Sequence, residues 1–448
     1  MRYLPHTPDE IQEMLSTIGV TDLKDLFQTI PAPLRLKRPL NLPEALSEID
    51  LKNHLRELSR KNAHGEEWSL FLGGGAYSHY IPSLVSYLIS RGEFLTTYTP
   101  YQPEISQGTL QAIFEYQTMV AEILGMEVAN ASNYDGSTGT AEAAKLALAV
   151  TGRKKILVAR SLHPEYREVL KTYLQNESVT MEEIPFTKEG TLDRAFLQKQ
   201  IGEETACIIA AYPSFFGTVE DLTDVAEQIH QKGGLFITST TEPLALGLFK
   251  SPGEMGADIA VAEGQSFGVP MSFGGPYLGM FATKKEYVRA IPGRLIGETV
   301  DTEGKRGFVL TLATREQHIR RERASSNICT NVSLCALAAT ITLALWGKKG
   351  FEELAQLNFD RAADLKERLA KISGVEFIFP SITFNEFVIR TKKKPSELIS
   401  KLVREKILMG IALDRWYPEL ENSILLCATE MNTPEQIERL VRCLEKIV

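Results

Sequence analysis

The sequence contains little cysteine, five residues in a chain of 448, and no two of them form a CxxC pair. They are scattered along the chain, at Cys207, Cys329, Cys335, Cys427 and Cys443. An odd number of widely spaced cysteines argues against a disulfide framework and gives no zinc-ligand spacing. The seven histidines also lack an arrangement of the HExxH kind. We therefore expect free thiols in a reducing compartment and no metal site.

Long apolar runs and an excess of positive charge are missing as well. The most apolar stretch, Leu334 to Trp346, is shorter than the ~20 residues that span a bilayer. The N-terminal residues lack the apolar run of a signal peptide. Lys and Arg total 49 against 57 Asp and Glu, so the bulk charge does not favour binding to a phosphate backbone. These absences predict a cytoplasmic protein with neither a membrane nor a nucleic acid as partner.

The length and an apolar content of 44% are those of a packed globular protein with several structural units. Residues 1–65 are predicted to form an N-terminal helical arm. Its first helix is indicated by Thr7-Pro8-Asp9-Glu10, which combines a hydroxyl N-cap, an early proline and a glutamate three residues after the cap. A second helix is expected from about Pro43 to Lys61, after a proline-rich connector. The arm would bury little core of its own.

Residues 66–330 are predicted to form a large α/β domain. Short apolar segments indicate strands at 155–159, 206–211, 235–238 and 258–261. Helical segments alternate with them, at 112–124, 140–150, from Pro164 onward and at 222–231. Apolar strands that alternate with helices predict a mostly parallel sheet covered on both faces.

Residues 331–448 are predicted to form linking helices and a small C-terminal α+β domain. The linking helices are an apolar one at 331–346 and a charged one at 351–372. Strands are expected at 384–390 and 423–427, and helices at 395–406 and 434–448. The last helix begins with Thr433-Pro434-Glu435-Gln436, a second capping-box pattern.

A turn of small residues precedes the alanine-rich helix at 140–150. Its backbone N–H groups and the helix dipole suit a phosphate monoester, and the residues concerned are Gly136, Ser137 and Thr138. Turns of this kind are also common for purely structural reasons, and this one matches neither the Walker A nor the Rossmann spacing. On this segment alone, both interpretations stay open.

In this context the turn resembles the phosphate-binding turn of fold-type I pyridoxal-phosphate enzymes. The resemblance implies an aspartate on a later strand and, roughly two dozen residues further, a lysine that binds the cofactor covalently. In this chain Ser239 stands where the aspartate belongs, and Gln265 stands where the lysine belongs. A serine cannot hold the pyridinium charge and an amide cannot form an imine. We therefore expect a degenerate cofactor pocket.

His163 is the remaining candidate for this pocket. It follows the strand at 155–159. At this place, the members of the family that hold the cofactor carry a histidine that stacks on the cofactor ring. The resemblance implies a relic of that stacking residue. A histidine at a helix start near solvent is the alternative, and the sequence favours neither.

Four longer segments resemble the P-protein of the glycine cleavage system. They are Phe71–His79, Tyr98–Gln107, Phe267–Pro276 and Arg320–Thr330. They occur in the order found in that family, and the remaining architecture is compatible, so the resemblance covers essentially the whole chain. The family occurs either as one chain of two homologous halves or as two separate subunits, and the catalytic lysine belongs to the second half. This chain resembles the first half, which implies the first subunit of the split form.

The resemblance implies an oxidoreductase activity that requires a second chain. A homologous lysine-bearing subunit, with two copies of each chain in the assembly, would hold pyridoxal phosphate covalently. The enzyme would decarboxylate glycine and pass the aminomethyl group to the lipoyl group of the H-protein. Two alternatives are an independent pyridoxal-phosphate transferase, against which Gln265 argues, and a non-catalytic scaffold, which sequence alone does not separate from a catalytic subunit.

Five further residues are candidates for lining the substrate site or the subunit interface: Tyr98, Tyr101, Gln102, Glu104 and His79. The first four lie in a loop that Pro100 and Pro103 should hold extended rather than helical. Aromatic and carboxylate side chains on such a loop suit a small zwitterionic substrate, and a packed interface loop is the alternative. We expect the loop to reach the partner's cofactor site. His79 follows three glycines and is either a binding residue or a satisfied structural histidine.

Overall fold

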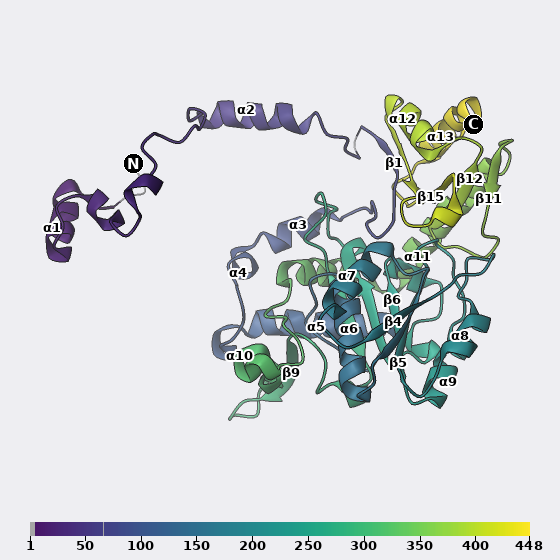
Figure 1. The fold of residues 1–448 in the computed structure, drawn as a ribbon, viewed down its shortest axis with the longest axis horizontal. Helices are drawn as coiled ribbons and strands as arrows, with labels where there is room; N and C mark the ends of the chain where they lie inside the picture. The colour runs from purple at the N-terminus through teal and green to yellow at the C-terminus, as the bar shows by residue number, and fades with distance from the viewer. Residues whose placement is uncertain (1–4, 66) are drawn as a thin grey trace. The chain divides into compact units, whose positions relative to one another are not determined.

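The structure is a computed structural model that describes residues 5–65 and 67–448. These residues fall into two units, and the boundary along the chain lies between Asn62 and Ala63 (Figure 1). The first unit contains the helices α1 (Pro8–Ile18) and α2 (Glu48–Ser59) and the short 3-10 helices η1 (Leu23–Phe27) and η2 (Ala32–Leu34).

Both α-helices of the first unit begin at a hydroxyl cap. The Thr7 hydroxyl accepts from the Glu10 N–H, and the Glu10 carboxylate accepts from the Thr7 N–H, which is the predicted capping box. The helix α2 begins later than predicted from Pro43, because the Ser47 hydroxyl accepts from the Asp50 N–H and so fixes the start at Glu48.

The main sheet of the second unit has seven strands. Its order is β2 (Val128–Ala129), β8 (Gly279–Thr283), β7 (Ile259–Glu263), β6 (Leu235–Thr240), β5 (Thr205–Ala211), β3 (Lys155–Ala159) and β4 (Thr180–Ile184). The strands β3 to β7 run parallel, whereas β8 is antiparallel to β7 and β2 is antiparallel to β8. The predicted mostly parallel sheet is confirmed.

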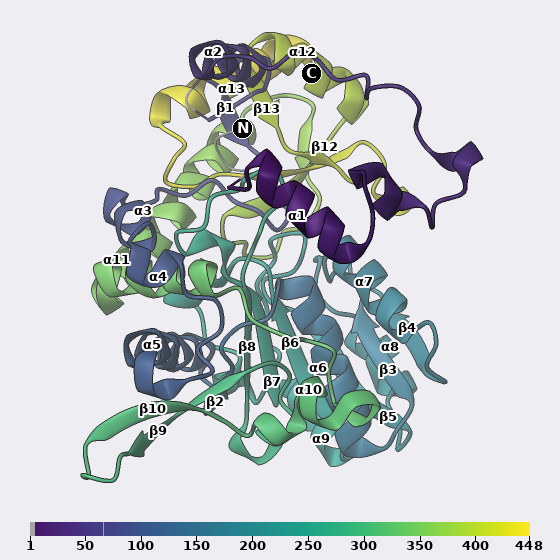
Figure 2. The ribbon, with the colours of Figure 1, turned by 90° about the vertical axis from the view of Figure 1, so that its left-hand side faces the viewer.

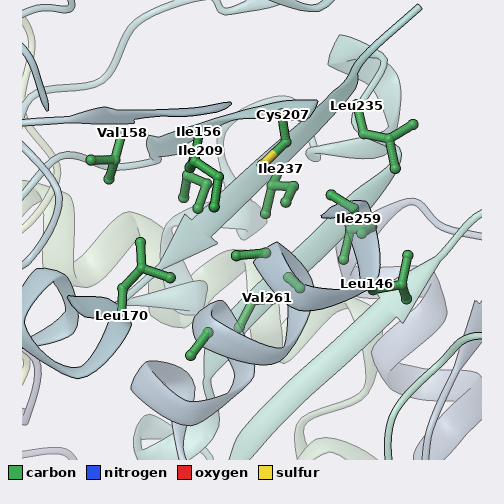
Figure 3. Close-up of a cluster of buried hydrophobic side chains, with 14 of the residues drawn as sticks. Leu146, Ile156, Val158, Leu170, Cys207, Ile209, Leu235, Ile237, Ile259 and Val261 are labelled. Carbon is green, nitrogen blue, oxygen red and sulfur yellow. The ribbon is translucent and has the colours of Figure 1, made fainter. Parts of the chain in front are cut away.

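Helices cover both faces of this sheet. One face packs against α6 (Gly136–Thr151) and α7 (Pro164–Leu174), and Figure 3 shows Leu146 and Leu170 from these helices among side chains of the strands. The other face packs against α5 (Gln107–Leu124), α8 (Arg194–Gln200), α9 (Thr223–Gln231) and α11 (Ser333–Leu369). Alternate residues of each strand point to opposite faces, so a strand buried on both sides is apolar throughout.

The C-terminal part contains a four-stranded antiparallel sheet. Its order is β11 (Val375–Phe377), β12 (Glu386–Thr391), β15 (Ser423–Cys427) and β14 (Ile411–Ala412). The helices α12 (Pro395–Arg404) and α13 (Pro434–Ile447) pack against it through buried side chains. The two predicted linking helices are both present: α11 covers them, and the non-helical backbone of Gly347 separates one from the other. Near the start of the unit, β1 (Ser69–Phe71) pairs in parallel with β13 (Ile407–Met409), so it lies with this C-terminal part (Figure 1).

Several elements were not predicted from the sequence. They are the antiparallel hairpin of β9 (Leu295–Val300) and β10 (Arg306–Thr311), and the short helices α3 (Ser83–Ile89), α4 (Gly92–Leu95) and α10 (Gln317–Arg320), all visible in Figure 2. Within the part of the chain that the structure describes, no helix is both long enough and apolar enough to span a membrane.

Candidate functional site

The predicted cofactor-pocket residues come from three elements at the carboxyl edge of the main sheet. Ser239 lies near the end of β6, and Gln265 lies in η6 (Gly264–Ser266), directly after β7. The strands β6 and β7 are parallel neighbours, so their carboxyl ends share one edge. The Ser239 hydroxyl lies 2.8 Å from the hydroxyl of Thr140 on α6. Both Ser239 and Gln265 are buried.

The side-chain amide of Gln265 is fully used in hydrogen bonds. Its oxygen accepts from the Tyr77 N–H at 2.8 Å. Its nitrogen donates to the Tyr77 carbonyl at 3.1 Å and to the Val269 carbonyl at 2.8 Å. A buried amide with all these partners is a structural clamp, because each bond satisfies a group that would otherwise be buried unpaired. Here the clamp fastens the loop at Tyr77 to the end of β7.

The N-terminus of α6 is occupied by two carboxyl groups of this chain. Asp135 is the N-cap, and its side chain accepts from the Thr138 N–H at 2.8 Å and from the Ser137 hydroxyl at 2.7 Å. Glu263, from the end of β7, accepts from the Gly136 N–H at 2.9 Å. Two of the backbone donors that would bind a phosphate monoester, the N–H groups of Gly136 and Thr138, are therefore engaged by acidic side chains.

Glu263 is held in place by further backbone donors. Its second carboxyl oxygen accepts from the Leu278 N–H at 2.9 Å and from the Gln265 N–H at 3.2 Å. Burial raises the pKa of Glu263 to about 8, although the backbone hydrogen bonds oppose this shift. The carboxyl group therefore belongs to the packed structure of this edge.

The small residues of the turn are needed for packing and leave no cradle for a phosphate. A Cβ at Gly136 would lie 2.5 Å from the hydroxyl of Tyr166, and a Cβ at Gly139 would lie 2.8 Å from a methyl group of Val261. The residues present do not fit pyridoxal phosphate. The predicted lysine position holds a hydrogen-bonded amide, the predicted aspartate position holds a serine bonded to Thr140, and carboxyl groups cap the helix.

His163 caps the start of α7. Its Nδ1 accepts from the Glu165 N–H at 3.2 Å, so Nε2 carries the proton and donates to the Gly74 carbonyl at 2.7 Å. The ring lies 4.9 Å from the rings of both Tyr166 and Phe215. Burial lowers its pKa, so the neutral form is favoured. His163 does start a helix, as one reading held, but it is buried rather than near solvent.

His79 lies between two carboxylates that come from different parts of the second unit. Its Nδ1 is 2.8 Å from a Glu430 oxygen, and its Nε2 is 2.9 Å from a Glu242 oxygen. Burial by itself would lower its pKa, but the two carboxylates outweigh this effect and raise the pKa to about 10. The ring is therefore a charged imidazolium with both N–H groups donating. Glu430 also accepts from the Tyr80 N–H at 2.7 Å and from the Asn358 side chain at 3.0 Å.

Next to this ion pair lies a second buried carboxyl group, Glu386 on β12. One oxygen accepts from the Gly74 N–H at 2.6 Å, and the other accepts from the Tyr77 hydroxyl at 2.9 Å. Burial raises the pKa of Glu386 to about 7. The loop of residues 73–80 is thus fastened to the main sheet through Gln265 and Glu242, and to the C-terminal part through Glu386 and Glu430.

The loop at 98–104 lies on the surface. Tyr98, Tyr101, Gln102 and Glu104 are all exposed. The Arg294 guanidinium donates to the Tyr101 hydroxyl at 2.9 Å and lies 4.8 Å from the centre of its ring. Pro103 begins the short 3-10 helix η3 (Pro103–Ile105), so the expectation of a fully extended loop was wrong; proline is tolerated at a first helical position. None of these four side chains is bonded to Ser239 or Gln265 in the described part of the chain.

Sequence reasoning missed five polar residues that organise the site. They are Tyr77, Glu242, Glu263, Glu386 and Glu430. Glu263 had a usable signal, because it ends a buried apolar strand two residues before Gln265. The other three carboxyl groups contact residues that lie more than 160 positions away in the chain, so no local pattern reveals them.

Comparison with known proteins agrees with this architecture. The family model of the glycine cleavage system P-protein matches residues 1–444. A probable glycine dehydrogenase (decarboxylating) subunit 1 of Desulforamulus reducens is 50% identical over 440 residues and covers 98% of both chains. A protein of the same description from Brevibacillus brevis is 50% identical over 446 residues and covers 100% of this chain and 99% of its own.

Solved structures give the same result. An inhibitor-bound crystal structure of glycine decarboxylase (P-protein) of the glycine cleavage system matches with a TM-score of 0.92, at 45% identity and full coverage of both chains. A NifS-like protein matches with a TM-score of 0.63 at 14% identity, covering 85% of this chain and 99% of its own, which shows a shared fold. The chain belongs to the glycine cleavage system P-protein family.

Proposed function

We propose that this chain is the subunit of a glycine-decarboxylating enzyme that does not carry the cofactor. A homologous lysine-bearing subunit completes the enzyme, which removes CO2 from glycine and passes the aminomethyl group to the lipoyl group of the H-protein. Family membership and full-length similarity to proteins described as subunit 1 support this function. The free cysteines are consistent with a reducing, cytoplasmic location.

The hydrogen-bonded amide of Gln265 is the observation that supports placing the cofactor on the partner subunit. This position offers no amine, and its side chain is committed to Tyr77 and Val269. In the fold family, this edge of the sheet holds a cofactor. Here Glu263 and Asp135 occupy the start of α6. Gln265, at the same edge, fixes the loop of residues 73–80. Pyridoxal phosphate would therefore be held by the partner subunit.

The exposed loop at 98–104 is proposed as this chain's contribution to the partner's site. It presents two tyrosines, an amide and a carboxylate to its surroundings. Arg294, which is buried, bonds to Tyr101 and to the Cys329 carbonyl, and so holds the middle of the loop. A surface loop braced from inside can present polar groups to a neighbouring chain with little loss of entropy.

The arm, residues 1–65, is proposed to cover the partner subunit. It exposes many large apolar side chains: Leu23, Leu26, Phe27, Ile30, Leu34, Leu36, Leu40, Leu42, Leu46, Ile49, Leu51, Leu55 and Leu58. Apolar surface of this extent in one segment is characteristic of an interaction site. Residues 66–330 and 331–448 are proposed as the large and the small domain.

Co-expression with the homologous lysine-bearing subunit tests the proposal. Exchange of labelled bicarbonate into glycine, with lipoylated H-protein present, should require both chains. After incubation with pyridoxal phosphate and reduction by borohydride, mass spectrometry should find the covalent label on the partner alone. Covalent label on this chain, or exchange by this chain alone, would overturn the proposal. Full exchange by the partner without this chain would show that this chain is a non-catalytic scaffold.

A further inference from the structure

A small cavity outside the site described above is lined mainly by arginine. Its volume is about 150 Å³, and its lining residues are Arg289, Leu312, Thr314, Arg315 and Arg320, which we call the arginine pocket. The arginines come from three places: after η7 (Lys285–Tyr287), at the end of η8 (Ala313–Arg315) and at the end of α10, which is labelled in Figure 2. Pockets for drug-sized ligands are roughly 300–1,000 Å³, so this one suits a small ion or a single terminal group.

Arg315 is the buried member of the arginine pocket. Arg315 is only 8% exposed, whereas Arg289 and Arg320 are exposed. Its Nη1 donates to the Ile291 carbonyl. Its Nε and Nη2 are buried and have no hydrogen-bond partner in the described part of the chain. These two atoms form the edge of the guanidinium that pairs with two oxygens of one oxyanion.

In the described part of the chain, no carboxylate lies within ion-pair distance of these three arginines. Among the residues that the structure describes, none of the three arginines forms an ion pair with Asp or Glu. Glu316 raises the pKa of Arg315, but burial lowers this pKa and has the larger effect. Arg194, a partly buried arginine elsewhere in this acidic chain, is paired with Glu220 and Asp224. The buried Arg294 has no carboxylate partner either, but two of its nitrogens bond to the Cys329 carbonyl and the Tyr101 hydroxyl. A buried cation without a counter-charge is costly, so an anion in this cavity would be bound favourably.

We propose that the arginine pocket is a binding site for an oxyanion of the phosphate class. A phosphate offers two oxygens to the free edge of Arg315 and further oxygens to Arg289, Arg320 and the Thr314 hydroxyl. Three converging positive charges favour a dianion over a single carboxylate. The site takes either free inorganic phosphate or the phosphate group of a small monoester. The proposal is independent of glycine decarboxylation, since it uses none of the residues assigned to that function.

Isothermal titration of the full-length chain with sodium phosphate, at constant ionic strength maintained with chloride, tests the site. Wild-type protein should bind one phosphate per chain. Arg320→Gln should weaken binding about tenfold, because one charge-assisted contact is lost. Arg315→Lys keeps the charge but lacks the two-pronged edge, and should weaken binding at least as much. Circular dichroism establishes that each variant is folded; should Arg315→Lys not fold, Arg289→Gln takes its place with Arg320→Gln.

Arg323→Gln is the matched control. Its side chain is 86% exposed, lies in the same basic segment and is not part of the arginine pocket. This variant should bind phosphate as the wild type does. Titration with O-phosphoserine distinguishes the sources: tighter binding of the monoester assigns the site to a phosphorylated small molecule, and tighter or equal binding of inorganic phosphate assigns it to the free ion. Absence of phosphate binding by the wild type would overturn the proposal, and so would equal loss of affinity in Arg323→Gln and Arg320→Gln.

Discussion

Gln265 and Tyr77 are joined by two hydrogen bonds, one to each end of the Gln265 amide. The pair connects the end of a strand in the main sheet to a loop 188 residues earlier in the chain. A lysine at this position would provide donors but no acceptor for the Tyr77 N–H. The residue that we propose replaces the cofactor-binding lysine therefore also links two distant parts of the chain.

Gln265→Lys should not restore a cofactor site. We expect no borohydride-trapped pyridoxal phosphate on the variant, because Glu263 and Asp135 still cap α6. Loss of the acceptor for Tyr77 and burial of an amine should lower the free energy of unfolding by about 2 kcal/mol. Urea denaturation measures this change, and Gln231→Lys, at an exposed position, is the control that should be near neutral. A variant that is covalently labelled and as stable as the wild type would contradict the structural role assigned to Gln265.

His79→Gln should be strongly destabilising. Removing the imidazolium leaves Glu242 and Glu430 facing each other without a cation, and breaking one partner of a buried ionic network costs about 3–5 kcal/mol. The control is His318→Gln, whose half-exposed ring lies 3.7 Å from Glu316 and should contribute less than about 1 kcal/mol. Thermal and urea unfolding provide the comparison. Similar losses in the two variants would contradict the charged state assigned to His79.

The stability of the chain should fall as the pH rises from about 5 to 8, in part because of Glu386. Its pKa is raised from 4.5 to about 7 in the folded chain, so the folded state holds the proton more tightly than the unfolded state. Its contribution is complete below about pH 4.5 and is lost as the pH rises through 7. At about 1.4 kcal/mol per pKa unit, the loss is at most about 3.5 kcal/mol.

Glu386→Gln should remove this part of the pH dependence. The amide keeps an acceptor for the Gly74 N–H and can donate to the Tyr77 hydroxyl, so the packing is preserved. Urea unfolding of wild type and variant between pH 5 and 8 should give curves that lie close together at pH 5 and separate toward pH 8, where the wild type becomes the less stable protein. Glu263 titrates in the same direction in both proteins and cancels in the difference. Parallel curves would show that Glu386 is not protonated in the folded state.

Gln102→Ala and Glu104→Ala should each lower glycine exchange by the two-subunit enzyme about tenfold, which corresponds to the loss of one polar contact in the transition state. The two subunits should still co-elute in gel filtration. Glu189→Ala, another exposed loop position, serves as the control and should retain full activity. Unchanged exchange in both loop variants would leave the loop as a packing element only.

Deletion of residues 1–60 should weaken assembly with the partner subunit, because the apolar side chains of the arm would no longer be available. A milder variant, Leu51→Ser with Leu55→Ser, removes two exposed leucines from one face of α2. Lys52→Ser on the same helix is its control. Sedimentation velocity should show a larger fraction of free subunits for the deletion and the leucine variant than for the control. An intact assembly in all three would exclude the arm from the interface.

The alternation of apolar strands with helices was sufficient to predict the parallel sheet, because strands buried on both faces must be apolar and helices must cover them. The strand at 155–159 and the start of the helix at Pro164 were placed correctly. The hairpin of β9 and β10 was not predicted, since its strands contain glycine and charged residues and lack a clear alternation. The break between the two linking helices was predicted to follow Trp346, and the non-helical backbone of Gly347 confirms it.

By itself, the sequence determined the fold class and the family, and it predicts that Gln265 and Ser239 stand at the positions of the cofactor-binding lysine and aspartate. These conclusions depend on residue identity and order, which are local properties. Only the tertiary structure decided which groups bond to these two residues and to the neighbouring loop: Tyr77 at Gln265, Thr140 at Ser239, and Glu386 and the His79 ion pair at the loop of residues 73–80. Their partners lie far apart in the chain, and a buried polar group is satisfied by whatever the fold brings within hydrogen-bonding distance.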